Sequence, residues 1–329
     1  MIPQKIVKGE IMAIYKEYKD IYKNQIENMF NTEIAVYPLH DDKKTIVPLS
    51  HNCKGKCSAC SHDCYKALGE LMRKNLVFYC YGEEEVVKKY KSGLFSNLEN
   101  AIKYAYKNRL PKRMPNQDGL PSEVLFDLLI QSLLPDAYKL AVRAILRQND
   151  NNEIKGYDLT YFTNENGRIT LWLGQAKLGD ESYCKSGINQ DLTSKFDTGY
   201  LSKQIFFIAE KQVGLSDEGI QLTDIINQLN MITIEQNEQN RAKAFVDFLL
   251  QKNISINIPC LLAYGKDSIY QSVSDVEEQI NREIERIEKY FDSHKYVFSG
   301  FQPNLLFFVF PIENLIGLRG NGGFYEGLH

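Results

Sequence analysis

The dipeptide Asn166-Gly167 constrains this chain most, because Asn-Gly between two strand-like segments is the strongest short-range signal for a two-residue hairpin turn. Lys155-Gly-Tyr-Asp158 lies before the turn, and Ile169-Thr-Leu-Trp-Leu-Gly-Gln-Ala-Lys177 follows it. With these two residues as the loop, Asp158 lies directly opposite Gln175, and both side chains leave the same face. Lys177 is two residues further on, so it points to that face as well. Turn chemistry alone therefore predicts a carboxylate, an amide and an ammonium group in one cluster.

The surroundings of this cluster are apolar. Leu171, Leu173, Phe162 and Thr160 share its face of the predicted hairpin, so the polar group ends an otherwise buried stripe. Buried charges are usually paired or bind a metal. Two interpretations stay open at this point: a metal site, or a plain salt bridge between Asp158 and Lys177.

The residue types suit phosphodiester hydrolysis, which needs a metal at the scissile phosphate and a positive group near the developing charge. Oxygen ligands favour Mg²⁺ or Mn²⁺. Asp158 would be the principal ligand, and Lys177 would orient or help to deprotonate the attacking water. Glu123, in the first turn of a helix expected to begin at Ser122, is a candidate additional ligand. Gln175 offers only a neutral amide oxygen where a carboxylate would be expected, so lower metal affinity is expected.

Three segments together resemble the PD-(D/E)xK nuclease superfamily and, within it, the HamA family of the Hachiman anti-phage defence system. These segments are Lys155-Gly-Tyr-Asp158, Leu171-Trp-Leu-Gly-Gln-Ala-Lys177 and Ser122-Glu-Val-Leu-Phe-Asp-Leu-Leu129. The resemblance covers roughly residues 120–312 and includes a less specific strand, Phe308-Val-Phe-Pro311. It implies an α/β restriction-endonuclease-like core with a mixed central sheet flanked by helices. It also implies DNA cleavage with Mg²⁺ or Mn²⁺ and a HamB-like superfamily 2 helicase partner.

Carried over by position, Asp158 and Lys177 match the family motif and Glu123 matches its helix acid, whereas Gln175 departs from the usual Glu. The departure has three interpretations: a natural active variant, a degenerate binding site, or an introduced substitution. The function is accordingly predicted as a DNA nuclease subunit acting with a helicase. The alternative is a catalytically degenerate subunit that clamps DNA or restrains the helicase.

A second candidate metal site lies in the N-terminal part, where four cysteines fall close together: Cys53, Cys57, Cys60 and Cys64. Four thiolates at this spacing suit tetrahedral Zn²⁺ or, less favourably, an iron–sulfur cluster. The first three also fit a radical-SAM pattern, but no βα-barrel pattern follows them. Reduced cysteines without a metal are the main alternative. A third functional hypothesis is a cysteine-metal interaction module carried on a nuclease-like scaffold.

The net charge of -3 argues against a protein that coats nucleic acid non-specifically, so phosphate contacts must come from local basic groups. Arg143 and Arg147, on one face of a predicted helix, are candidates, as is Lys195 on the helix after the Gln175 strand. The N-terminus has no apolar leader, and no apolar run is long enough to span a bilayer. A cytoplasmic protein without membrane contact is therefore expected.

Hydrophobic periodicity and the positions of Pro and Gly predict two domains. These are an N-terminal α+β domain (1–115) with the cysteine site and a nuclease-like domain (120–329), joined by a Pro- and Gly-containing linker over 107–119. Strands are expected at 33–37, 76–80, 155–177 as a hairpin, 254–263 and 304–310. Helices are expected within 1–30 and at 83–106, from 122, and at 137–148, 187–197, 199–211, 216–251 and 273–291.

Overall fold

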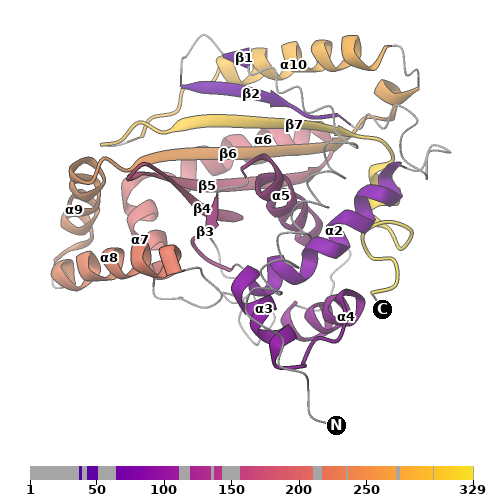
Figure 1. The fold of residues 1–329 in the computed structure, drawn as a ribbon. Coiled ribbons are helices and arrows are strands. Elements are labelled where there is room, and N and C mark those ends of the chain that lie inside the picture. Colours follow the sequence, from indigo (N-terminus) through magenta and orange to yellow (C-terminus); the bar gives the residue numbers. More distant parts are fainter. Residues whose placement is uncertain are drawn as a thin grey trace.

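The computed structural model describes most of the chain. The described residues are 37–38, 43–50, 64–110, 119–134, 137–142, 156–209, 217–234, 236–271, 275–298 and 300–328. Within them the protein is an α/β structure in which helices cover both faces of one mixed sheet (Figure 1).

The sheet has seven strands in the order β1-β2-β7-β6-β5-β4-β3. Their bounds are β1 Tyr37–Pro38, β2 Lys44–Pro48, β3 Tyr138–Lys139, β4 Leu159–Glu165, β5 Arg168–Gly179, β6 Ser255–Gly265 and β7 Asn304–Ile312. The central strands β5, β6, β7 and β2 are parallel, whereas β1, β4 and β3 pair antiparallel with their neighbours. The three central pairs β5–β6, β6–β7 and β7–β2 lie between helical layers, which explains their nearly continuous apolar sequences.

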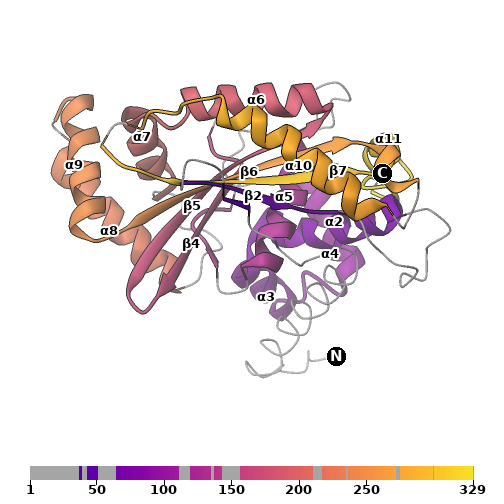
Figure 2. The same ribbon diagram turned by 90° about the horizontal axis from the view of Figure 1, so that it is seen from above.

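Two hydrophobic clusters separate the faces of the sheet. Trp172, Ala176 and Leu178 of β5 belong to the cluster that includes α2 and α5. Leu171 and Leu173 belong to the cluster that includes α6, α7, α9 and α10. Alternate residues of β5 thus enter different cores, as the two-residue period of a strand requires. Figure 2 shows α6 and α10 on one side of the sheet and α2 to α5 on the other.

Most of the predicted helices are present, with shifted ends. Their bounds are α2 Cys64–Tyr81, α3 Glu83–Lys91, α4 Leu98–Arg109, α5 Leu120–Leu133, α6 Glu181–Ser194, α7 Thr198–Ala209, α8 Asp217–Thr233, α9 Glu238–Gln251, α10 Val276–Asp292 and α11 Leu315–Arg319. The predicted helix over 83–106 is two helices, and so is that over 216–251. The expected N-cap at Ser122 is wrong, because α5 begins two residues earlier, after Gly119, with Pro121 in its first turn. Residues 1–36 and 111–118, which hold a predicted helix and most of the linker, lie outside the described residues.

Two predicted elements are wrong. The apolar run at 76–80, expected as a strand, is the second half of α2. Every residue from Asn75 to Tyr81 is buried there, so the run is apolar because the helix is enclosed on all sides. The segment expected as a helix from 137 contains β3, which pairs with β4 through Tyr138 and Phe162. Residues 143–150 lie outside the described residues.

The described N-terminal residues share the sheet and core of the rest. β2 pairs in parallel with β7, from Lys44 opposite Leu305 to Pro48 opposite Val309. α2 and α5 contribute to the same apolar cluster. The predicted division into two domains stays a prediction, but no separate N-terminal core exists among these residues. Among all the residues that the structure describes, every helix is too short or too polar to cross a bilayer.

Candidate active site

The hairpin that carries the predicted residues has the register that turn chemistry predicts. Asn166 and Gly167 both have positive φ, 53° and 86°, as the tight primed turns of hairpins require. β4 and β5 pair from Glu165 opposite Arg168 to Leu159 opposite Gly174. One step beyond, the amide of Asp158 donates to the carbonyl of Gly174 across 2.9 Å. This bond is one residue out of the register of the ladder. The predicted register is therefore confirmed from Glu165–Arg168 to Leu159–Gly174, whereas the position of Asp158 directly opposite Gln175 stays a prediction.

Asp158 lies just outside the first residue of β4 and is half-buried. Its Oδ2 accepts a hydrogen bond from the backbone amide of Ala176 at 2.9 Å. The carboxylate thus continues the ladder by one hydrogen bond after the backbone pairing ends. This contact fixes the acid against the strand segment that holds Gln175 and Lys177.

Gln175 is fully buried, and both ends of its amide are engaged. Its Nε2 donates to the carbonyl of Gly156 at 3.4 Å. Its Oε1 accepts from Nζ of Lys195, which lies 2.8 Å away at the C-terminal end of α6. The oxygen that would face a cation is therefore already in contact with an ammonium group.

Lys177 reaches across the face of the sheet to α6, where its Nζ lies 2.7 Å from Oδ2 of Asp191. Gly187 makes this path possible, because a Cβ at that position would lie 2.9 Å from Cε of Lys177. Burial acts to lower the pKa of Lys177. The hydrogen bond and charge of Asp191, aided by the charge of Asp158, outweigh burial and raise the pKa above its ordinary value.

Asp191 also pairs with Lys195, whose Nζ lies 3.0 Å from its Oδ1. The hydroxyl of Tyr157 donates to the carbonyl of Lys195 at 2.9 Å, so the end of α6 is tied to the residue that precedes Asp158. Lys195 was predicted as a phosphate contact, and in the structure its ammonium belongs to this cluster. Asp191 was missed, although its position four residues before Lys195 in a helix is the spacing of an ion pair.

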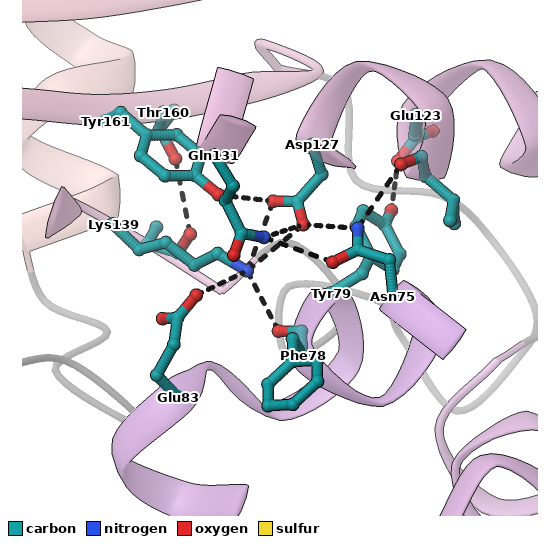
Figure 3. A network of polar contacts seen from close by, with 12 residues as sticks. Asn75, Phe78, Tyr79, Glu83, Glu123, Asp127, Gln131, Lys139, Thr160 and Tyr161 are labelled. Atoms are coloured by element: carbon teal, nitrogen blue, oxygen red, sulfur yellow. Dashed lines mark hydrogen bonds and ion pairs between the residues drawn. The ribbon is translucent and has the colours of Figure 1, made fainter. Parts of the chain in front are cut away.

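Glu123, the predicted additional ligand, lies on α5, the helix that packs on the other face of the sheet. Its carboxylate is buried and accepts a hydrogen bond from the hydroxyl of Tyr79 (Figure 3). One turn further along α5, the ring of Phe126 lies against Gly174, the residue before Gln175. The proposed participation of Glu123 in a metal site stays a prediction.

Glu123 neighbours a buried polar network centred on Asp127, also on α5 (Figure 3). The carboxylate of Asp127 receives hydrogen bonds from four side chains: Asn75 (2.9 Å), Gln131 (2.6 Å), Tyr161 (2.6 Å) and Lys139 (3.2 Å). Lys139 also donates to the carbonyl of Phe78 at 2.9 Å and lies 3.6 Å from Glu83. Burial acts to lower the pKa of Lys139, but Asp127 and Glu83 outweigh it and raise the pKa. The network joins α2, α3 and α5 to β3 and β4.

The other predicted ligands fall largely outside the described residues. This holds for Cys53, Cys57 and Cys60 and for the basic pair Arg143 and Arg147. Cys64 is buried at the first residue of α2. Among the described residues, no three His, Cys, Asp or Glu side chains gather as a metal site. The polar cluster beside β5, called the β5 cluster below, has two carboxylates and one amide together with two lysines: Asp158, Asp191, Gln175, Lys177 and Lys195.

Comparison with known families gives a match over nearly the whole chain. The model of the HamA family matches residues 16–327. The chain belongs to the HamA family. Through its name, this family is part of Hachiman, an anti-phage defence system, so a role in antiviral defence follows. The match to the HamA family also includes the N-terminal part, which the resemblance seen in the sequence did not cover. No curated protein matches the chain.

Proposed function

We propose that this HamA-family chain is a metal-dependent DNA nuclease subunit that hydrolyses phosphodiester bonds and acts with a helicase partner. The observation that carries the proposal is the register of the hairpin. It brings Asp158 to the strand segment that holds Gln175 and Lys177, where the carboxylate accepts from the amide of Ala176 and its charge acts on Lys177. The spacing of a D…QxK pattern by itself, without the turn between its two parts, would not require these groups to meet.

The donor set fits a hard divalent cation. Asp158 supplies a carboxylate and Gln175 an amide oxygen, and oxygen donors suit Mg²⁺ or Mn²⁺. These two residues would hold the metal, which would neutralise the scissile phosphate and activate water. We expect weak affinity, because the oxygen of Gln175 is neutral and already accepts from Lys195 at 2.8 Å.

Lys177 would contribute positive charge beside the phosphate. Its ammonium is held by Asp191, and its aliphatic chain passes over Gly187, so its position is fixed before substrate arrives. Fixed charges of this kind stabilise a transition state without reorganisation at the moment of reaction. This chain's own contribution is thus to hold Asp158 and Lys177 in one cluster at the end of the hairpin.

The direct test replaces Asp158 or Lys177 with Ala and measures DNA cleavage by the purified chain with its helicase partner, in Mg²⁺ and in Mn²⁺. Each change is expected to lower the rate at least about 100-fold in a chain that still folds, as thermal unfolding would show. Asp180→Ala, which removes an exposed acid three residues after Lys177, is the matched control and should cleave normally. Cleavage that survives both changes contradicts the assignment.

A second candidate function is a catalytically silent subunit that clamps DNA or restrains the helicase. The hydrogen bond from Lys195 to Gln175, and the pairing of Asp191 with both lysines, favour it, because the charges of the cluster already satisfy one another. Gln175→Glu separates the two functions. A gain of cleavage would mean that the amide silences the site. DNA binding without cleavage in both forms would support the clamp.

A further inference from the structure

Asp191 is the one acid of the β5 cluster that lies on a different element from the hairpin. It is buried on α6, with 9 % of its side chain exposed, and its two oxygens contact two different lysines. Lys177 comes from β5 and lies 2.7 Å away, and Lys195 comes from the same helix and lies 3.0 Å away. The charges of Asp191 and of the hairpin acid Asp158 both act on Lys177.

Gln175 and Asp191 converge on the same ammonium group. Nζ of Lys195 lies 2.8 Å from Oε1 of Gln175 and 3.0 Å from Oδ1 of Asp191. A Glu at position 175 would therefore form an ion pair with Lys195, as Asp191 does. Position 175 thus has the cationic neighbour that a carboxylate would need. The carboxylate that contacts this neighbour belongs to Asp191 on α6.

Stability alone does not account for the charge of Asp191, because buried ion pairs often contribute no more to stability than apolar residues of the same size. Its position is well determined. Tyr157 ties the end of α6 to the residue before Asp158, and Cys184 and Ile188 anchor the helix in the core. Lys177 lies within the electrostatic reach of both Asp158 and Asp191. Two acids therefore flank one lysine.

We propose that Asp191 is the second carboxylate of the candidate active site, contributed by α6 in place of the acid that β5 lacks at position 175. This inference rests on the proposed function for its chemical meaning, because the two carboxylates would together attract a divalent cation. Lys195 is the shared partner that balances whichever of the two positions carries the acid.

The test is a charge swap. Four forms of the full chain are compared with the natural one: Asp191→Asn, Gln175→Glu, the double variant with both changes, and Asp180→Asn as an exposed control. Each change keeps the shape of the side chain. Binding of Mn²⁺ is measured by calorimetry, folding by thermal unfolding, and DNA cleavage in parallel.

Asp191→Asn is expected to weaken Mn²⁺ binding by about tenfold or more, and the double variant to recover most of that loss. Gln175→Glu alone should bind Mn²⁺ more tightly than the natural chain, and Asp180→Asn should be unchanged. The single Gln175→Glu variant removes no buried charge, so it remains informative if Asp191→Asn fails to fold.

The inference is overturned if Asp191→Asn binds Mn²⁺ as the natural chain does, if the folded double variant recovers nothing, or if the natural chain binds no Mn²⁺. A natural chain that binds Mn²⁺ and shows the swap, yet cleaves no DNA, overturns the nuclease function and leaves this inference standing. Cleavage that is unaffected by the swap overturns the inference and leaves the nuclease function standing.

Discussion

Nζ of Lys177 lies 2.7 Å from Oδ2 of Asp191, and this ion pair joins the strand of the candidate site to the helix that covers it. The pair depends on a residue with no side chain. Gly187 lies one turn before Asp191, where any Cβ would come within 2.9 Å of Cε of Lys177. The position of the lysine is therefore set by packing against α6 as well as by charge.

Gly187→Ala should separate activity from stability. The new methyl group displaces the flexible end of Lys177, while Ala in a helix is favoured over Gly by about 1 kcal/mol. We expect DNA cleavage to fall about 10- to 100-fold, because small misplacements of reacting groups are costly, with an unfolding temperature equal to or above that of the natural chain. Ser186→Ala, an exposed change one residue away, should leave both unchanged. A fully active Gly187→Ala chain would show that the position of Lys177 is unimportant.

Gly174→Ala should destabilise the fold from the other face of the same strand. A Cβ at this position would lie 2.5 Å from Cε1 of Phe126 and 2.9 Å from the carbonyl oxygen of Pro259, so α5 and β6 would both have to move. We expect a loss of about 1–3 kcal/mol in the free energy of unfolding, measured in urea. Phe126→Leu in the same chain should recover part of it. Gly322→Ala, with open space around it, is the control, and an equal loss there would contradict the packing argument.

The parts of this site that sequence predicts are those that local chemistry determines. Asn166 and Gly167 set the register of the hairpin, so the closeness of Asp158 to the segment that holds Gln175 and Lys177 could be derived without a structure. Asp191 could not, because its contact with Lys177 depends on how α6 packs on the sheet. The spacing of Asp191 and Lys195 was visible, but many solvated helices carry such pairs.

The elements of the fold that could be predicted from sequence are likewise those with a clear local pattern. The late strands β6 and β7 were predicted because each is a long apolar run flanked by polar residues. The short strand β2 was not, because its pairing with β7 joins residues far apart in the chain and its five residues carry a weak pattern. Lys139 was assigned to a helix, whereas it lies in β3, where the partner Asp127 stabilises its charge.

Lys139→Met should test whether the network around Asp127 holds α2 and α5 to the sheet. Removing the ammonium leaves the buried carboxylate of Asp127 without its closest charge partner, at 3.1 Å. We expect a loss of about 3–5 kcal/mol in the free energy of unfolding. The control is Lys103→Met, whose exposed pair with Glu99 should cost no more than about 0.5 kcal/mol. If both variants lose the same small amount, the buried pair does not hold these elements together.

Glu181, at the first residue of α6, should make the stability of the chain depend on pH. Burial acts to raise its pKa, but hydrogen bonds from Arg286 and Lys185 outweigh burial and lower the pKa from 4.5 to about 2. Because the folded pKa lies below the unfolded value, the stabilisation is complete above pH 4.5 and is lost as the pH falls toward 2. Glu181→Gln should therefore cost about 1 kcal/mol at pH 6, and the difference from the natural chain should shrink between pH 4.5 and pH 3. Urea unfolding across this range measures it, with the exposed Glu285→Gln as control. A difference that stays constant with pH would show that the Glu181 carboxylate is not specifically stabilised in the folded chain.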